Sequence, residues 1–257
     1  MKISFKTSQQ ETTFDNLAAI WRLADDIEVY QGGWLFDHFY PLFTDNSLSC
    51  FEAWTLAGAL GSITSRLRIG HMVTSNTYRH PAVAANSVAT LDHITGGRAE
   101  FGFGAGWFED EHEAYGIPLP PLTERFDRFD EALEAIDLLL TKPVTDFDGK
   151  YYQLSQAHCE PKALQQPRPP FVIGGKGERR LLRSTARWAD HYNYPGCWRP
   201  PKRSVTWAGI PHDHRWETPF RRRWGPGPAG RRWRFFLGRP GPDGMAGSGQ
   251  SSGWRMS

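Results

Sequence analysis

Short apolar runs alternate with longer amphipathic segments through residues 1–198. The apolar runs, which predict buried strands, lie at 1–5, 34–36, 67–73, 98–103 and 171–173. The segments with helical spacing between them lie at 51–60, 81–93, 123–140 and 178–190. Strands that alternate with helices of this length predict an α/β fold with a parallel sheet.

Local signals add detail to this pattern. A first helix is predicted after a capping Thr13 or Asp15. The inward face of that helix is expected to consist of Leu17, Ile20, Trp21 and Ala24. Gly32-Gly33 is expected to break the chain, the segment 147–152 to form a hairpin, and His191 to begin a further strand.

A composition boundary falls near Trp198. Residues 199–257 contain 11 Arg and 1 Lys against 3 acidic residues, a net charge of +9 that leaves −7 for the rest of a chain whose total is +2. This tail has 8 Pro, 10 Gly and 5 Trp, but only one Val, one Ile and one Leu. No core strand or helix is predicted in it. We expect residues 199–257 to be disordered or encoded out of frame.

Length and cysteine content narrow the class of protein. A chain of 257 residues has the usual size of one (β/α)8 barrel. Cys50, Cys159 and Cys197 have no metal-binding spacing, and so few thiols indicate a reducing, cytoplasmic location. The N-terminal apolar run is too short for a signal peptide, and no run is long enough to predict a membrane span.

Two polar motifs follow predicted strands. Asp37-His38 comes after the strand at 34–36, where a parallel barrel places its active-site groups. A capping aspartate beside a packed histidine explains this pair equally well. Gly174-Gly175-Lys176-Gly177 lies between a strand and a helix, and its free amides and lysine charge favour a bound phosphate over a simple turn.

Gly102, Gly104 and Gly106 alternate through the end of the strand at 98–103 and the loop after it. Glycine in a strand lets a flat ligand or another backbone approach closely. Because the spacing is G-x-G-x-G and not G-x-G-x-x-G, we reject a dinucleotide-binding loop. The acidic run at 109–113 is interpreted as a solvated helix start and not as a metal site.

Seven motifs occur in an order that is known from one family. They are Asp37-His38-Phe39, Arg66 to Gly70 with Val73-Thr74, Tyr78 to Pro81, Ala89 to Asp92, Gly96-Gly97-Arg98, Gly102 to Trp107 and Ile173 to Glu178. Through them, residues 2–196 resemble the bacterial luciferase-like flavin and deazaflavin oxidoreductases, most closely the actinobacterial subgroup that uses coenzyme F420. The resemblance implies a (β/α)8 TIM barrel, here incomplete after its fifth or sixth strand, and a homodimer.

The resemblance also implies a cofactor site. A bulge with a non-prolyl cis peptide at Met72-Val73, followed by Thr74, would back one face of the ring. Asp37 would lie near the polar edge of the ring, and His38 near its reacting carbon. The cofactor would be lined by Gly104, Ala105 and Gly106, and its phosphate would be held by Gly174, Gly175, Lys176 and Gly177.

The implied chemistry is hydride transfer between F420 and a small-molecule substrate, with His38 as the acid or base. Trp107 stands where the sugar-phosphate dehydrogenases of the family have an acidic residue, so the substrate class stays open. FMN, used by a monooxygenase, is the alternative cofactor, and a truncated, non-functional chain is a third interpretation. Nucleic-acid binding by the arginine- and tryptophan-containing segments 221–224 and 231–234 is a weaker alternative, because no recognition module accompanies them.

Overall fold

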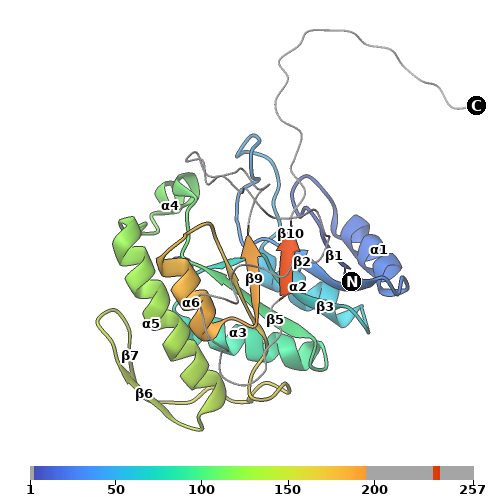
Figure 1. Cartoon of the computed structure of the whole chain (residues 1–257). Helices are drawn as coiled ribbons and strands as arrows, with labels where there is room; N and C mark the ends of the chain where they lie inside the picture. The colour runs from blue at the N-terminus through green and yellow to red at the C-terminus, as the bar shows by residue number, and fades with distance from the viewer. Residues whose placement is uncertain (1–2, 195–233, 238–257) are drawn as a thin grey trace, which may run out of the picture.

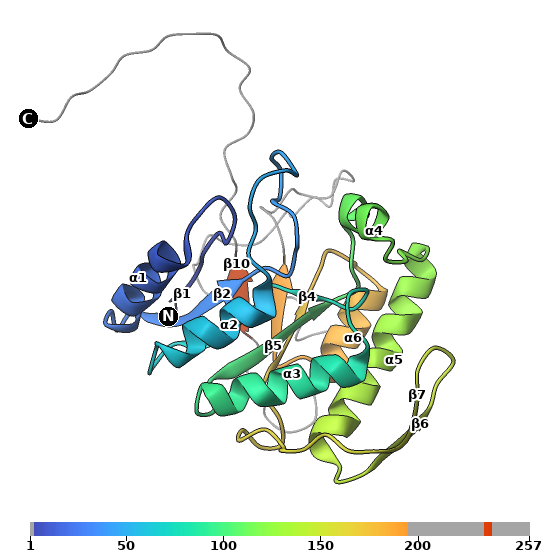
Figure 2. The same cartoon turned by 180° about the vertical axis from the view of Figure 1, so that it is seen from behind.

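The computed structural model describes residues 3–194 and 234–237. Its main sheet has the order β1-β2-β3-β5-β8-β9-β10, with β4 paired to β5, and these pairings are parallel, as predicted. The strands of this sheet are β1 Ile3–Lys6, β2 Tyr30–Leu35, β3 Arg68–His71, β4 Thr74–Ser75, β5 Ala99–Gly104, β8 Phe171–Gly174, β9 His191–Tyr194 and β10 Arg234–Leu237. The sheet curls into a half-barrel (Figures 1 and 2).

Helices flank this curled sheet, and α4 lies beyond the carboxyl ends of the strands (Figures 1 and 2). They are α1 Phe14–Asp25, α2 Ala53–Ser62, α3 Pro81–Ile94, α4 Glu109–Tyr115, α5 Leu122–Thr141 and α6 Arg180–Trp188. The predicted hairpin is confirmed as the antiparallel pair β6 Thr145–Asp148 and β7 Gln153–Ala157, beside α5. No helix in the described ranges is both long and apolar enough to cross a bilayer.

The hydrophobic core lies between the sheet and its helices. Phe101 and Phe103 of β5 are both buried. Phe101 packs against Phe171 of β8 with 5.4 Å between ring centroids, and Phe103 packs against Phe129 of α5 at 5.2 Å. Burial of each such side chain contributes about 1.5–3 kcal/mol. These contacts fix β5, which leads directly into the rim that carries the candidate site.

The Gly96-Gly97-Arg98 turn fixes the start of β5. Both glycines have positive φ, 63° and 86°, a conformation that glycine adopts at little cost. The Arg98 guanidinium donates hydrogen bonds to the carbonyl oxygens of Gly61, Thr64, Leu67 and Thr95. This one side chain therefore ties the ends of α2 and α3 to β3.

Two predictions near the N-terminus are wrong. Ile20 does not face the core but is 48% exposed, because Leu17 and Trp21 make the buried face of α1. Gly32-Gly33 does not break the chain but lies inside β2. A Cβ at Gly33 would lie 2.5 Å from the Trp21 ring, so this strand needs glycine to let α1 approach.

The C-terminal tail holds one strand that the sequence did not predict. Arg234–Leu237 forms β10 and pairs in parallel with His191–Tyr194 of β9. A run of four residues among glycines, prolines and arginines is too short to give a strand pattern. The prediction that residues 199–257 are disordered or out of frame otherwise falls on residues outside the described ones.

Candidate active site at the carboxyl ends of the parallel strands

The loops that carry the predicted site residues lie at one rim of the half-barrel. Asp37, Gly104 and Gly175 follow or end β2, β5 and β8, and parallel pairing places the carboxyl ends of these strands together. The Ser75 amide, whose residue pairs with Gly104, donates to Asp37 Oδ2 at 3.0 Å. A Cβ at Gly104 would lie 3.3 Å from the Gly174 carbonyl oxygen. The three segments therefore converge.

The segment after β3 fills the space between these loops. The Met72-Val73 peptide is cis, as expected, and both side chains are half-buried. Added Cβ atoms at Gly104 and Gly174 would lie 2.8 and 2.6 Å from the Val73 methyl groups. These two glycines therefore make room for Val73, a packing role that the sequence alone did not predict.

The other predicted lining residues differ in accessibility. Ala105 and Gly106 are half-buried at the rim, whereas Thr74 is fully buried. Gly106 has φ of 85°, and a Cβ there would lie 2.6 Å from Thr77 Oγ1. Its carbonyl oxygen accepts a hydrogen bond from Arg125 Nη1 at 2.6 Å. Thr74 therefore lies beneath the accessible surface of the rim, whereas Ala105 and Gly106 are part of that surface.

Asp37 is only 1% exposed and is fixed through one of its oxygens. Oδ2 accepts from the Ser75 amide and from Arg79 Nη1 at 2.6 Å, and Arg79 also donates to Glu52 Oε1 at 2.8 Å. Oδ1 is buried and has no hydrogen-bond partner among the described residues. Because buried acceptors are nearly always paired, this oxygen is suited to receive a donor group of a ligand.

His38 lies against a buried carboxylate. Its Nδ1 atom is 2.9 Å from Oε2 of Glu111, a residue of α4 that is fully buried. Glu111 also accepts hydrogen bonds from the Phe39 amide at 2.6 Å, from the Tyr40 amide at 2.7 Å and from the Tyr78 hydroxyl. Among the described residues, the ring atom of His38 that takes part in a side-chain hydrogen bond is Nδ1, not Nε2.

The electrostatics of this cluster favour an ionised Glu111. Burial opposes ionisation, but hydrogen bonds from His38, Tyr78 and the Tyr40 amide outweigh it and lower the pKa of Glu111. Burial and the hydrogen bond to Glu111 raise the pKa of Tyr78, so its hydroxyl stays protonated and donates. The rim thus contains a carboxylate, a phenol and an imidazole in direct contact.

The interpretation of residues 109–113 as solvated is wrong for two of them. Glu111 is 0% exposed and His112 is 2% exposed, because α4 packs one face onto the rim. His112 Nε2 lies 2.7 Å from Thr77 Oγ1, and its Nδ1 lies 2.5 Å from the Phe108 carbonyl oxygen. Glu109 and Glu113 are exposed, as predicted.

Aromatic side chains surround the His38 ring. The ring centroids of Phe36, Trp107 and Phe108 lie 5.9, 5.6 and 5.5 Å from that of His38. Trp107 is 53% exposed, so it forms part of the outer surface of the rim. Trp107 occupies the position that is acidic in the sugar-phosphate dehydrogenases. The acid beside His38 is instead Glu111.

The Gly174–Gly177 segment leads into α6. The Gly175 amide donates to the Asn193 carbonyl oxygen at 3.1 Å, and the Gly175 carbonyl accepts from the Tyr192 hydroxyl at 2.9 Å. Gly175 is therefore fixed to β9. Lys176 is exposed, and the amides of Lys176 and Gly177 form no hydrogen bond with any described residue. An anion at this point would meet two free amides and one ammonium group.

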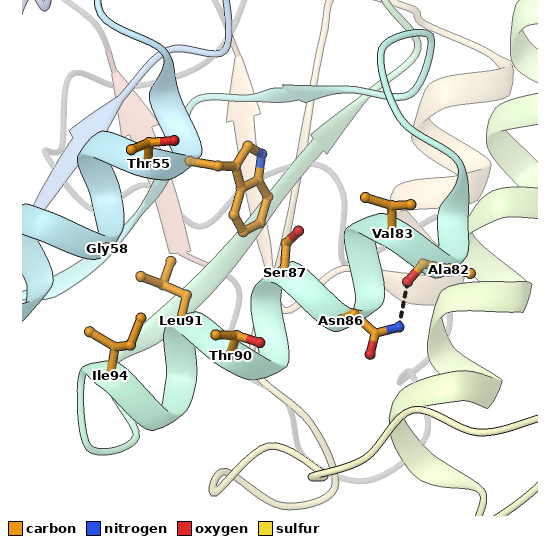
Figure 3. Close-up of a pocket in the computed structure, with 10 residues that line it drawn as sticks. Thr55, Gly58, Ala82, Val83, Asn86, Ser87, Thr90, Leu91 and Ile94 are labelled. Carbon is orange, nitrogen blue, oxygen red and sulfur yellow. Dashed lines mark hydrogen bonds between the residues drawn. The ribbon is translucent and has the colours of Figure 1, made fainter.

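A separate cavity of about 610 Å³ lies between α2 and α3. Figure 3 shows the side chains of both helices along it, with Asn86 Nδ2 donating to the Ala82 carbonyl oxygen. No residue that lines this cavity is titratable. It therefore offers no acid or base, and its polar groups are the Asn86 amide, the Trp54 indole N–H and the hydroxyls of Thr55, Ser87 and Thr90.

A curled parallel α/β sheet with a bulge after β3 and polar side chains at the carboxyl ends of its strands places the molecule in the TIM-barrel class. The sequence profile of one family in this class, the luciferase-like monooxygenases, matches residues 2–209. The chain therefore belongs to this family, and the family that the motifs indicated is confirmed.

Relatives within this family use two different cofactors. The chain is 30% identical over 178 residues to an F420-dependent glucose-6-phosphate dehydrogenase of Amycolatopsis mediterranei, which covers 68% of this chain and 52% of the relative. It is 32% identical over 141 residues to an FMNH2-dependent dimethylsulfone monooxygenase of Pseudomonas putida, which covers 55% of this chain and 38% of that enzyme.

Solved structures agree on the fold. An F420-dependent secondary alcohol dehydrogenase, solved with an F420-acetone adduct, superposes with a TM-score of 0.65 at 23% identity, over 76% of this chain and 58% of the other. The chain spans about half the length of the curated relatives it matches.

Three side chains of the candidate site are not predicted by the sequence. Glu111 belongs to an acidic run that predicts exposure, and Tyr78 and Arg79 belong to a motif that assigns them no role. All three residues share one feature of the sequence: each lies in a segment that follows the carboxyl end of a predicted strand. What the sequence lacked was the direction in which α4 faces, which decides that Glu111 and not Glu113 reaches His38.

Proposed function

We propose that this chain carries the cofactor and proton-transfer site of an F420-dependent oxidoreductase that moves a hydride between the deazaflavin and a small organic substrate. The observation that carries the proposal is the convergence of Asp37, His38 and the Met72-Val73 bulge at one rim. The relative that aligns over the longest stretch of those described above is F420-dependent, which favours this cofactor.

The residues of the rim fit such a cofactor. Asp37 Oδ1 is a buried acceptor with no partner among the described residues, suited to a ring N–H or hydroxyl. Val73 offers an apolar surface between β5 and β8, as a flat ring needs. The free amides of Lys176 and Gly177, with the Lys176 ammonium, are suited to its phosphate. When bound, a deazaflavin accepts or supplies a hydride as a two-electron carrier.

His38 supplies the proton chemistry of the proposed reaction. Removal of a hydride from an alcohol carbon requires a base for the hydroxyl proton, and the reverse reaction requires an acid. Neutral imidazole performs the first task and imidazolium the second. The Phe36, Trp107 and Phe108 rings beside His38 favour a substrate whose reacting carbon carries apolar substituents.

The second candidate is an FMN-dependent monooxygenase. It is favoured by the 32% identity to an FMNH2-dependent enzyme of the same family. The rim residues described above accommodate either ring, because an apolar floor, a buried acceptor and two amides do not distinguish a flavin from a deazaflavin.

Side-by-side fluorescence titration of the purified chain with F420 and with FMN tests both proposals. We expect F420 to bind more tightly, and we expect Asp37→Asn to weaken binding because the amide replaces one acceptor oxygen by a donor. Tighter binding of FMN would support the monooxygenase instead. Binding of neither cofactor would contradict both proposals and favour a truncated, inactive chain.

The role of His38 needs a separate variant. His38→Ala is expected to leave F420 binding within about threefold and to lower hydride transfer by about 10²–10⁴-fold, the range for loss of a positioned acid or base. The matched control is His158→Ala, since His158 is exposed and lies in the segment after β7, which is not part of the candidate site. Equal rates in the two variants would remove His38 from the proposed mechanism.

A further inference from the structure

Glu111 is a fully buried carboxylate that makes no contact assigned to cofactor binding. We propose that Glu111 is a positioning residue: it holds the proton of neutral His38 on Nδ1 and thereby presents Nε2 as the nitrogen that exchanges a proton with the substrate. This inference rests on the proposed function, because it assigns the reactive atom of the same site.

The hydrogen bonds of Glu111 fix the direction of the His38 contact. Both carboxylate oxygens are occupied: Oε1 by the Phe39 and Tyr40 amides, and Oε2 by His38 Nδ1 and the Tyr78 hydroxyl. An ionised carboxylate can only accept hydrogen bonds. The hydrogen bond at 2.9 Å therefore requires that Nδ1 is the donor, which leaves the lone pair of neutral imidazole on Nε2.

The same carboxylate fixes the backbone that carries the histidine. Phe39 and Tyr40 follow His38 directly, so their two hydrogen bonds clamp the loop after β2 onto α4. The ring itself has aromatic neighbours on several sides, with centroids 5.5–5.9 Å away. The rotation that would exchange Nδ1 and Nε2 must break the hydrogen bond to Glu111.

Other titratable groups near His38 do not compete for Nδ1. Asp37 is engaged with Arg79 and the Ser75 amide. Cys50 Sγ is directed to main-chain carbonyl oxygens, at 3.6 Å from that of His38 and 3.9 Å from that of Phe51. His112 packs on the Tyr78 ring at 4.9 Å between centroids. Glu111 is therefore the group that decides the protonation of the ring.

In the oxidation of an alcohol, a bound deazaflavin would be the oxidant and would accept the hydride from the C–H bond that breaks. The O–H bond breaks and its proton passes to His38 Nε2, while the carbon–oxygen bond becomes a carbonyl. The imidazolium that forms carries protons on both nitrogens, and its charge is paired with Glu111 across the Nδ1 hydrogen bond.

The test uses histidine side-chain NMR on the whole chain without cofactor, so it does not depend on turnover. Long-range ¹H–¹⁵N spectra separate the Nδ1–H and Nε2–H tautomers, and His38→Ala assigns the signals. We expect the Nδ1–H form in the parent and a mixture or the Nε2–H form in Glu111→Gln. Glu113→Gln, which removes an exposed charge from the same helix, and Tyr78→Phe, which retains the carboxylate, are expected to keep the Nδ1–H form.

Two results would overturn the inference. One is the Nε2–H form in the parent, which remains decisive even if Glu111→Gln does not fold. The other is an unchanged Nδ1–H form in a folded Glu111→Gln. Failure of the proposed function would look different: the tautomers would behave as expected, but neither F420 nor FMN would bind. In an active chain, Glu111→Gln should also move the acidic limb of the pH–rate profile to lower pH, while Glu113→Gln should not.

Discussion

Gly104 is the residue whose substitution tests the packing of the rim most sharply. A Cβ at this position would lie 2.8 Å from Val73 Cγ2 and 3.3 Å from the Gly174 carbonyl oxygen. Normal contact between carbon atoms is about 3.5–4.0 Å, so the methyl group of Gly104→Ala overlaps Val73 by about 1 Å. Either Val73 moves or the strands separate.

The expected cost follows from this overlap. Insertion of a methyl group into a packed site destabilises by about 1–3 kcal/mol. For a chain of this size the change corresponds to a decrease of about 2–12 °C in the thermal midpoint. Val73→Ala removes the methyl group that the new Cβ would overlap. The double variant should therefore recover about 1–2 kcal/mol of the lost stability, an interaction energy within the usual range for residues in contact.

The assay is urea and thermal unfolding of the parent, both single variants and the double variant, followed by circular dichroism. Gly58→Ala is the matched control: its Cβ would lie 3.8 Å from Ile94 Cδ1, an ordinary contact, and alanine favours the interior of α2 by about 1 kcal/mol. We expect that control to be as stable as the parent or more stable.

Two outcomes would refute the reasoning about Gly104. If Gly104→Ala unfolds at the same urea concentration as the parent, Val73 does not occupy the space that the structure assigns to it. If the double variant shows only the sum of the two single effects, Gly104 and Val73 are not in contact. The same variants titrated with F420 would show whether Val73 is the surface that the ring meets, because Val73→Ala should then weaken binding.

Three further predictions concern acid stability, Arg98 and β10. The folded pKa of Glu111 lies below its unfolded value of about 4.3, so the ionised form stabilises the fold above that pH. This contribution is lost as pH falls through the folded pKa. Glu111→Gln should therefore lose less stability than the parent in urea unfolding as the pH is lowered below about 4.3. Arg98→Lys should lower the free energy of unfolding by about 1–3 kcal/mol. The reason is that an ammonium group cannot reach four carbonyl oxygens as a planar guanidinium does. Equal urea midpoints for the variant and the parent would contradict this prediction. Deletion of residues 199–257 removes β10 and uncovers the edge of β9. Light scattering should therefore show more self-association of the deletion variant than of the full chain. A deletion variant as monodisperse as the full chain would contradict this prediction.

The sequence predicted most of the α/β order because burial repeats locally. The stripe of Phe129, Leu133, Ile136 and Leu139 identifies α5 without any tertiary information, and all four are buried. Ile20 broke this rule because it lies at the edge of its stripe, where the packing of α1 against β2 decides which residues are covered.

The candidate site was predicted in part for a related reason. Asp37 and His38 follow a strand directly, and the carboxyl ends of parallel strands share one edge, so their position follows from topology. Glu111 could not be found this way, because its burial depends on how α4 packs against the loop after β2. The sequence also does not show that Gly104 leaves space for Val73, because this contact depends on the three-dimensional position of the bulge after β3.

Hydrogen–deuterium exchange of the whole chain, with and without F420, tests most directly the claim that one ligand binds across this rim. We expect slower exchange on F420 addition in all four segments, 37–40, 72–77, 104–107 and 174–178, and no change in α3, which lines the separate cavity. Protection confined to one of these segments, or protection of α3 instead, would contradict the account.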